Sequence, residues 1–158
     1  YQVGFGFDTG DQIFFDEDAP YLGRESGFNV NVTLRPVPSL QSRLSFDRSR
    51  FVDVARGDAE VFDARVFRIQ TTYQVTSRLN IRSITQYDTF DETLDLNLLG
   101  TYRVNAGTVF YLGYDDHYQQ LDDLVNDRDG DGVADGPTSR RRQTNRAIFL
   151  KLQYLFRY

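Results

Sequence analysis

Residues 127–135 carry the sharpest chemical motif of the sequence, DRDGDGVAD, which matches the pattern DxDxDGxxD. Carboxylates at alternate positions, a glycine at the sixth position and a backbone carbonyl at the seventh suit the hard cation Ca²⁺. The sequence therefore predicts bound Ca²⁺ here as a cofactor. The predicted calcium ligands are Asp127, Asp129, Asp131, Val133 through its carbonyl, and Asp135.

This motif resembles a single thrombospondin type-three or EF-hand-like calcium loop. Thr138 stands where an EF-hand loop places its twelfth-position acid, so we expect a site of modest affinity. The alternative is a flexible acidic loop rich in Asp-Gly turns. Both interpretations place the motif in an insertion at 121–143, the longest predicted connection between strands.

The only histidine, His117, directly follows Asp115 and Asp116. A catalytic base needs an orienting partner and a nucleophile or activated water within hydrogen-bond reach, and adjacency in sequence does not supply that geometry. We therefore expect no enzymatic activity. The alternative is a hydrolase that uses His117 with Asp115 or Asp116. The sequence contains no phosphate-binding glycine loop, zinc-ligand spacing or nucleophile elbow.

The composition excludes several classes of protein. A net charge of −5 in 158 residues, with a pI of about 4.8, argues against a nucleic-acid partner. The absence of cysteine excludes disulfides and thiolate metal sites. Uninterrupted apolar runs are only a few residues long, too short for a transmembrane helix. Because the sequence begins with Tyr1 rather than Met, we expect a mature or trimmed product.

Period-two alternation of apolar and polar residues dominates the chain and is typical of strands, whose successive side chains point to opposite faces. It is clearest where Phe28, Val30 and Val32 alternate with polar residues. The pattern predicts an all-β fold of about eight antiparallel strands. The expected strands lie near residues 1–8, 27–36, 40–52, 60–75, 79–90, 95–104, 108–119 and 144–158.

The connections alternate in length. Tight turns are predicted at 36–39, 76–78 and 105–107, and longer connections at 9–26, 55–59, 91–94 and 121–143. Short turns on one rim and longer loops on the other are typical of an antiparallel up-and-down transmembrane β-barrel. The eight strands either close on themselves or form the C-terminal part of a larger barrel. In both cases we expect the short turns and both termini to be periplasmic.

In such a barrel the apolar side chains face lipid and the polar side chains face the lumen. The predicted lumen-lining residues are Arg35, Arg43, Asp47, Arg68, Arg82, Asp88, Arg103, Asp115 and Lys151. They would form a salt-bridged interior in a closed eight-stranded barrel, or line a channel that favours anionic or sugar-like solutes in a larger one. Alternation alone leaves open a soluble lipocalin-like ligand-binding barrel with the opposite orientation.

Aromatic residues favour the membrane interpretation. The aromatic residues near the predicted periplasmic strand ends are Tyr73, Tyr102, Tyr154, Phe156 and Tyr158. Those near the opposite ends are Phe51, Phe90, Tyr114 and Tyr118, as interfacial girdles require. Apolar residues also recur at alternate positions up to the final aromatic residue. This terminal pattern resembles the signal recognised by the outer-membrane barrel-assembly machinery. The predicted signal residues are Leu152, Tyr154, Phe156 and Tyr158.

Three runs in roughly the last 80 residues carry a family resemblance: TYQVTSRLNIRSITQYDTFD, LLGTYRVNAGTVFYLGYDD and TNRAIFLKLQYLFRY. They resemble the C-terminal barrel of a bacterial outer-membrane family of undefined role, whose members carry an N-terminal domain like the family-nine carbohydrate-binding domain. The resemblance implies closing strands of a larger barrel. No catalytic residues are assigned in that family, so the resemblance carries none over to this chain.

Together these patterns predict a channel for small polar solutes, or the membrane anchor of a larger assembly. The expected location is the outer membrane of a Gram-negative-type bacterium, in contact with lipid and lipopolysaccharide.

Overall fold

The computed structural model of the chain describes residues 1–15, 20–120 and 141–156. Within these ranges the chain forms strands joined by turns, as alternation predicts. The strands are β1 (Gln2–Phe14), β2 (Tyr21–Val37), β3 (Leu40–Asp53), β4 (Ala59–Gln74), β5 (Leu79–Asp88), β6 (Thr93–Asn105), β7 (Thr108–Gln120) and β8 (Arg141–Tyr154).

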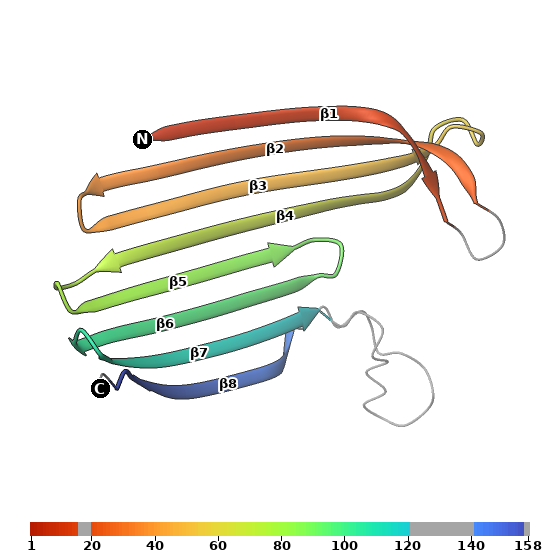
Figure 1. The fold of residues 1–158 in the computed structure, drawn as a ribbon. Helices are drawn as coiled ribbons and strands as arrows, with labels where there is room; N and C mark the ends of the chain where they lie inside the picture. Colours follow the sequence, from red (N-terminus) through yellow and green to blue (C-terminus); the bar gives the residue numbers. More distant parts are fainter. Residues whose placement is uncertain (16–19, 121–140, 157–158) are drawn as a thin grey trace, which may run out of the picture.

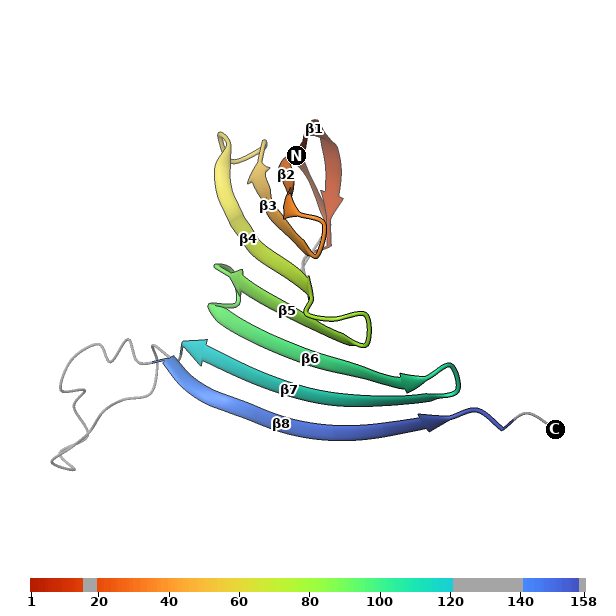
Figure 2. The ribbon, with the colours of Figure 1, turned by 90° about the vertical axis from the view of Figure 1, so that its left-hand side faces the viewer.

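All eight strands belong to one antiparallel sheet, in which each strand pairs with its neighbours in sequence. The sheet is open. Strands β1 and β8 form its two edges, lie far apart in Figure 2, and do not pair with each other in the described residues. The all-β, up-and-down prediction is therefore confirmed, whereas these eight strands do not close on themselves.

The connections define two ends of the sheet, visible in Figure 1. The short-turn end carries the β2–β3, β4–β5 and β6–β7 turns, and the long-loop end carries the others. At the short-turn end, the Thr76 hydroxyl accepts hydrogen bonds from the backbone N–H groups of Arg78 and Leu79. At the long-loop end, Asp53 and Asp88 accept bonds from backbone N–H groups of the turns that follow them. Both ends thus use local side-chain capping.

The first two strands are longer than alternation predicts. Residues 9–26 were expected to form a long connection, but β1 continues to Phe14 and β2 already begins at Tyr21. Cross-strand contacts explain the extension: Asp11 forms an ion pair with Arg24, and the Phe14 and Tyr21 rings lie 5.4 Å apart. Similarly, β8 begins at Arg141, inside the insertion predicted at 121–143.

The pairing register gives the sheet two chemically different faces. We name as the polar face the one that carries Asn31, Arg43, Arg68, Arg82, Asn97 and Asp115. The opposite face carries an apolar band, which on successive strands includes Phe5, Val32, Leu44, Ile69, Ile81, Leu98, Leu112 and Leu150. Among the described residues, Phe51 is the only buried apolar side chain, so the sheet has almost no core of its own.

Candidate functional site

The register brings the nine predicted lumen residues to one face. Each lies on the polar face, either because it pairs directly with another residue of that face or because it is an even number of positions from such a residue along its strand. The nine residues are Arg35, Arg43, Asp47, Arg68, Arg82, Asp88, Arg103, Asp115 and Lys151. Arg35 lies beside an irregularity in the β2–β3 register, and its Nε donates to Gln41 Oε1 at 2.9 Å. The polar face is therefore a continuous charged surface across seven strands.

Charges of opposite sign are separated along this face. Strands β2, β3, β5 and β6 each carry both signs, and on each of them the cation lies nearer the short-turn end. The pairs are Arg35 and Glu25, Arg43 and Asp47, Arg82 and Asp88, and Arg103 and Asp95. The short-turn half of the polar face is thus rich in guanidinium groups and the long-loop half in carboxylates.

The polar-face cations also differ from those of the other face in their partners. Five apolar-face arginines lie within 4.0 Å of a carboxylate, namely Arg24, Arg48, Arg50, Arg65 and Arg146. Within the described ranges, no such ion pair forms to Arg43, Arg68, Arg82, Arg103 or Lys151. Arg82 Nε is buried without a hydrogen-bond partner there. Guanidinium groups without carboxylates leave donors for water or an anion.

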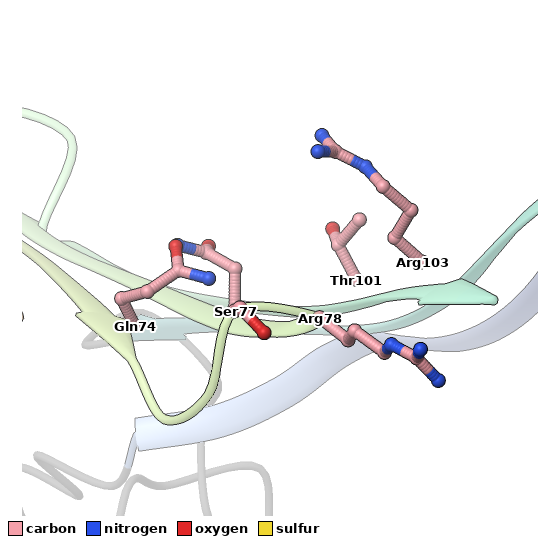
Figure 3. Close-up of a pocket in the computed structure, with 6 residues that line it drawn as sticks. Gln74, Ser77, Arg78, Thr101 and Arg103 are labelled. Atoms are coloured by element: carbon pink, nitrogen blue, oxygen red, sulfur yellow. The ribbon is translucent and has the colours of Figure 1, made fainter. Parts of the chain in front are cut away.

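Hollows occur along the polar face. One of about 540 Å³ lies at the short-turn end and is lined by Gln74, Ser77, Arg78, Asn80, Thr101 and Arg103. Figure 3 shows Thr101 and Arg103 projecting from the same side of the ribbon, whereas Arg78 points the other way. A second hollow of about 210 Å³ is lined by residues of β2, β3 and β4. The linings of both consist of polar side chains, mostly hydrogen-bond donors.

His117 lies on the polar face, but its partner is not the one that adjacency suggests. Its Nδ1 contacts Asp95 Oδ1 across the β6–β7 pair. Asp115 is on the same face and accepts a hydrogen bond from Asn97 Nδ2. Asp116 points to the opposite face, so the structure does not form the predicted pairing of His117 with Asp116. Sequence reasoning missed Asp95 because it lies on another strand.

Asp116 is the centre of a polar cluster on the apolar face. Its carboxylate is buried, with 4 % exposed, and accepts bonds from the hydroxyls of Tyr114 at 2.7 Å and Tyr118 at 2.9 Å. Arg146 Nη2 donates to it at 3.1 Å and Gln143 Nε2 also donates. These donors offset the cost of burying a charge. The two predicted girdle tyrosines thus lie beside this carboxylate.

A charged band separates the apolar band from the long-loop end on six strands. We define it as Asp11, Arg24, Arg48, Arg50, Glu60, Asp63, Arg65, Asp116 and Arg146. Arg48 donates two hydrogen bonds to Asp63, at 2.8 and 2.9 Å, and Arg65 donates two more, at 2.5 and 3.5 Å. These bonds lower the pKa of Asp63 below the usual aspartate range, and those from Arg48 have the largest effect.

An aromatic row crosses the long-loop end of the polar face. Phe51 stacks on Phe62 with ring centroids 5.8 Å apart and contacts Phe14 at 5.4 Å, while Phe62 also contacts Phe90. The prediction that Phe51 belongs to an interfacial girdle is wrong, because its side chain is only 3 % exposed and lies on the polar face. The row instead joins β1, β3 and β4 at this end.

The remaining predicted sites lie partly outside the described residues. The calcium residues Asp127, Asp129, Asp131, Val133 and Asp135, and the terminal Tyr158, all fall there. Leu152 and Tyr154 lie on the apolar face of β8, and the Tyr154 ring contacts that of Phe156 at 4.5 Å. Where the structure is described, no group of three or more potential ligands is placed to hold a metal ion.

The described part of the chain holds no helix that is long and apolar enough to span a membrane. The resemblance of the last 80 or so residues to the outer-membrane family stays a prediction. Comparison of the chain with family models, curated proteins and solved structures finds no match.

Proposed function

We propose that this sheet is part of an outer-membrane β-barrel whose apolar band faces lipid and whose polar face lines a water-filled channel for small polar solutes. The observation that carries the proposal is the apolar band itself. Its side chains project into solvent across the sheet, from Phe5 at 83 % exposed on β1, through Ile69 at 48 % on β4, to Leu150 at 74 % on β8. An exposed apolar surface that crosses a whole sheet needs an apolar partner.

The height of the apolar band supports lipid as that partner. On β2 the band runs from Phe28 to Val37, which is about 30 Å along a strand that rises ~3.3 Å per residue. At the tilt of roughly 35–45° found in membrane barrels, this length covers about 21–25 Å, close to the ~25 Å apolar belt of such barrels. The turns bound the band at one end and the charged band bounds it at the other.

The open edges of the sheet favour a larger barrel over a closed eight-stranded one. In hydrocarbon, every backbone N–H and C=O group needs a partner, so neither β1 nor β8 can remain an edge. Additional strands between them satisfy both edges and widen the lumen. The hollows and the polar-face arginines without carboxylate partners favour the same arrangement, because a packed interior would neutralise those charges internally.

Tryptophan fluorescence tests which face contacts lipid, since the sequence holds no tryptophan. Ile69 and Gln70 are neighbours on β4 that lie on opposite faces, so they form a matched pair. In vesicles with brominated acyl chains, Ile69→Trp should be quenched by the bromine and Gln70→Trp by acrylamide added to the water. The reverse pattern would refute the orientation, and a protein that stays monomeric without detergent would refute the membrane assignment.

Conductance separates a channel from a membrane anchor. We expect the protein to give stepwise currents in planar bilayers once the fluorescence pair has established its orientation. Lipid quenching of Ile69→Trp without any conductance would instead favour the alternative role, the membrane anchor of a larger assembly.

A further inference from the structure

The hollow between β2, β3 and β4 on the polar face brings two arginines and three neutral polar residues together. Its volume is about 210 Å³, and it is lined by Asn31, Arg43, Ser45, Arg68 and Gln70. The register explains the cluster: Arg43 lies opposite Gln70, and Ser45 lies between Asn31 and Arg68. The five side chains therefore occupy adjacent rows of the sheet rather than a loop, which fixes their backbone positions.

The side chains that line this hollow include hydrogen-bond donors and cations but no anions. Every side chain that lines it can donate hydrogen bonds, and no carboxylate is among them. Neither Arg43 nor Arg68 lies within 4.0 Å of a carboxylate of the described chain. On the opposite face of the same strand, Arg48 and Arg50 are both neutralised by acids. The absence of a counter-charge is thus specific to the polar face.

We propose that this hollow is a binding site for a small solute that carries an oxyanion, a phosphate or a carboxylate group. The planar guanidinium fork matches both groups and binds them with charge-assisted hydrogen bonds. The volume accommodates one such group with a small attached body. The inference rests on the proposed function, because a lumen keeps the polar face wet and open to solutes.

The separation of charges along the face gives the site a direction. Arg35, Arg82 and Arg103 lie on the short-turn half of the same face and extend the positive potential toward that end, whereas Asp47 and Asp88 lie toward the long loops. An anion therefore meets attraction from the short-turn end and repulsion from the long-loop end. We expect anionic solutes to reach the hollow mainly from the short-turn side.

Equilibrium dialysis of the detergent-folded protein with inorganic phosphate at low ionic strength tests the site. Wild-type protein should bind phosphate, and the double variant Arg43→Gln with Arg68→Gln should bind at least about tenfold more weakly. Arg50→Gln is the matched control, since it removes one charge from the opposite face of the same strand. Circular dichroism verifies that each variant is folded. If the double variant does not fold, Arg43→Lys provides a variant that preserves the charge.

Binding of phosphate and of succinate that is equal in the wild type and the double variant, or undetectable for both anions in the wild type, would overturn the proposal. Dialysis with succinate distinguishes a carboxylate site from a phosphate site. The proposed function fails separately: phosphate binding without lipid quenching of Ile69→Trp would retain the site and reject the barrel. Conductance without binding of either phosphate or succinate would retain the channel and reject the site.

Discussion

Replacing Gly23 by alanine should destabilise the sheet at its long-loop end. A Cβ atom added to Gly23 would lie 2.3 Å from the Cε1 and Cζ atoms of Phe51 and 2.6 Å from the backbone oxygen of Val52. The Phe51 ring has little freedom to withdraw, because it is buried and contacts the Phe14 and Phe62 rings. The substitution therefore either displaces this ring from the aromatic row or separates β2 from β3.

The expected magnitude follows from the cost of overpacking. Forcing a methyl group into a filled space costs about 1–3 kcal/mol, with rearrangement of rings and backbone. Gly10→Ala is the matched control, since Gly10 also lies on the polar face and has no atom within 4 Å of an added Cβ. There, the reduced freedom of the unfolded chain should stabilise the protein by about 0.4–1 kcal/mol. The same gain applies to Gly23→Ala and cancels in the comparison, so the two substitutions should differ by about 1–3 kcal/mol.

Urea unfolding of the folded protein in micelles, followed by circular dichroism, measures this difference. Adding Phe51→Leu to Gly23→Ala tests the mechanism, because the smaller side chain leaves room for the methyl group. The double variant should lose less stability than the sum of the two single variants, since side chains in contact couple by about 0.5–3 kcal/mol. Equal unfolding midpoints for Gly23→Ala and Gly10→Ala, or simple additivity with Phe51→Leu, would refute the reasoning.

Asp63→Asn should lower the thermal midpoint at neutral pH. Because the folded protein lowers the pKa of Asp63, the stability that its ionised carboxylate supplies is complete above the unfolded pKa of about 4 and is lost as pH falls through the lowered pKa. Thermal melts of both proteins across this pH range would show the difference shrinking. Glu92→Gly should raise the urea midpoint above that of Glu92→Ala, because Glu92 has φ of 51°; equal midpoints would count against this. Calorimetry should detect Ca²⁺ binding at millimolar concentration in wild type and weaker binding in Asp129→Ala; identical titrations would contradict the predicted ligands.

Alternation predicts the two faces of the sheet well because it depends only on the local geometry of a strand. Arg43, Arg68 and Arg82 share a face once neighbouring strands pair, and the tight turns set the register that aligns them. The strand lengths were less predictable at the start of the chain. Asp and Gly residues between 8 and 11 resemble a loop in sequence, but the Asp11–Arg24 pair makes them part of a ladder.

Side-chain contacts between strands could not be predicted from residues adjacent in the sequence. His117 contacts Asp95, which is 22 positions away, although two aspartates precede it directly. The buried position of Asp116 likewise depends on donors from β7 and β8 that only the folded register brings together. The closure of the sheet also depends on its curvature and on what pairs with β1 and β8, and no single strand pattern encodes either.

Pairing only between sequence neighbours has a consequence for how such a protein can change in evolution. Within the described residues each strand pairs only with the strands before and after it, so the sheet is modular along the chain, as in a linear array of repeats. Deleting one internal hairpin would break its two pairings with the flanking strands and form one new pairing of the same kind, whereas duplicating it would break one such pairing and form two. The number of strands in the assembled wall can therefore grow or shrink in steps of two, while all the remaining hairpins keep their polar and apolar faces.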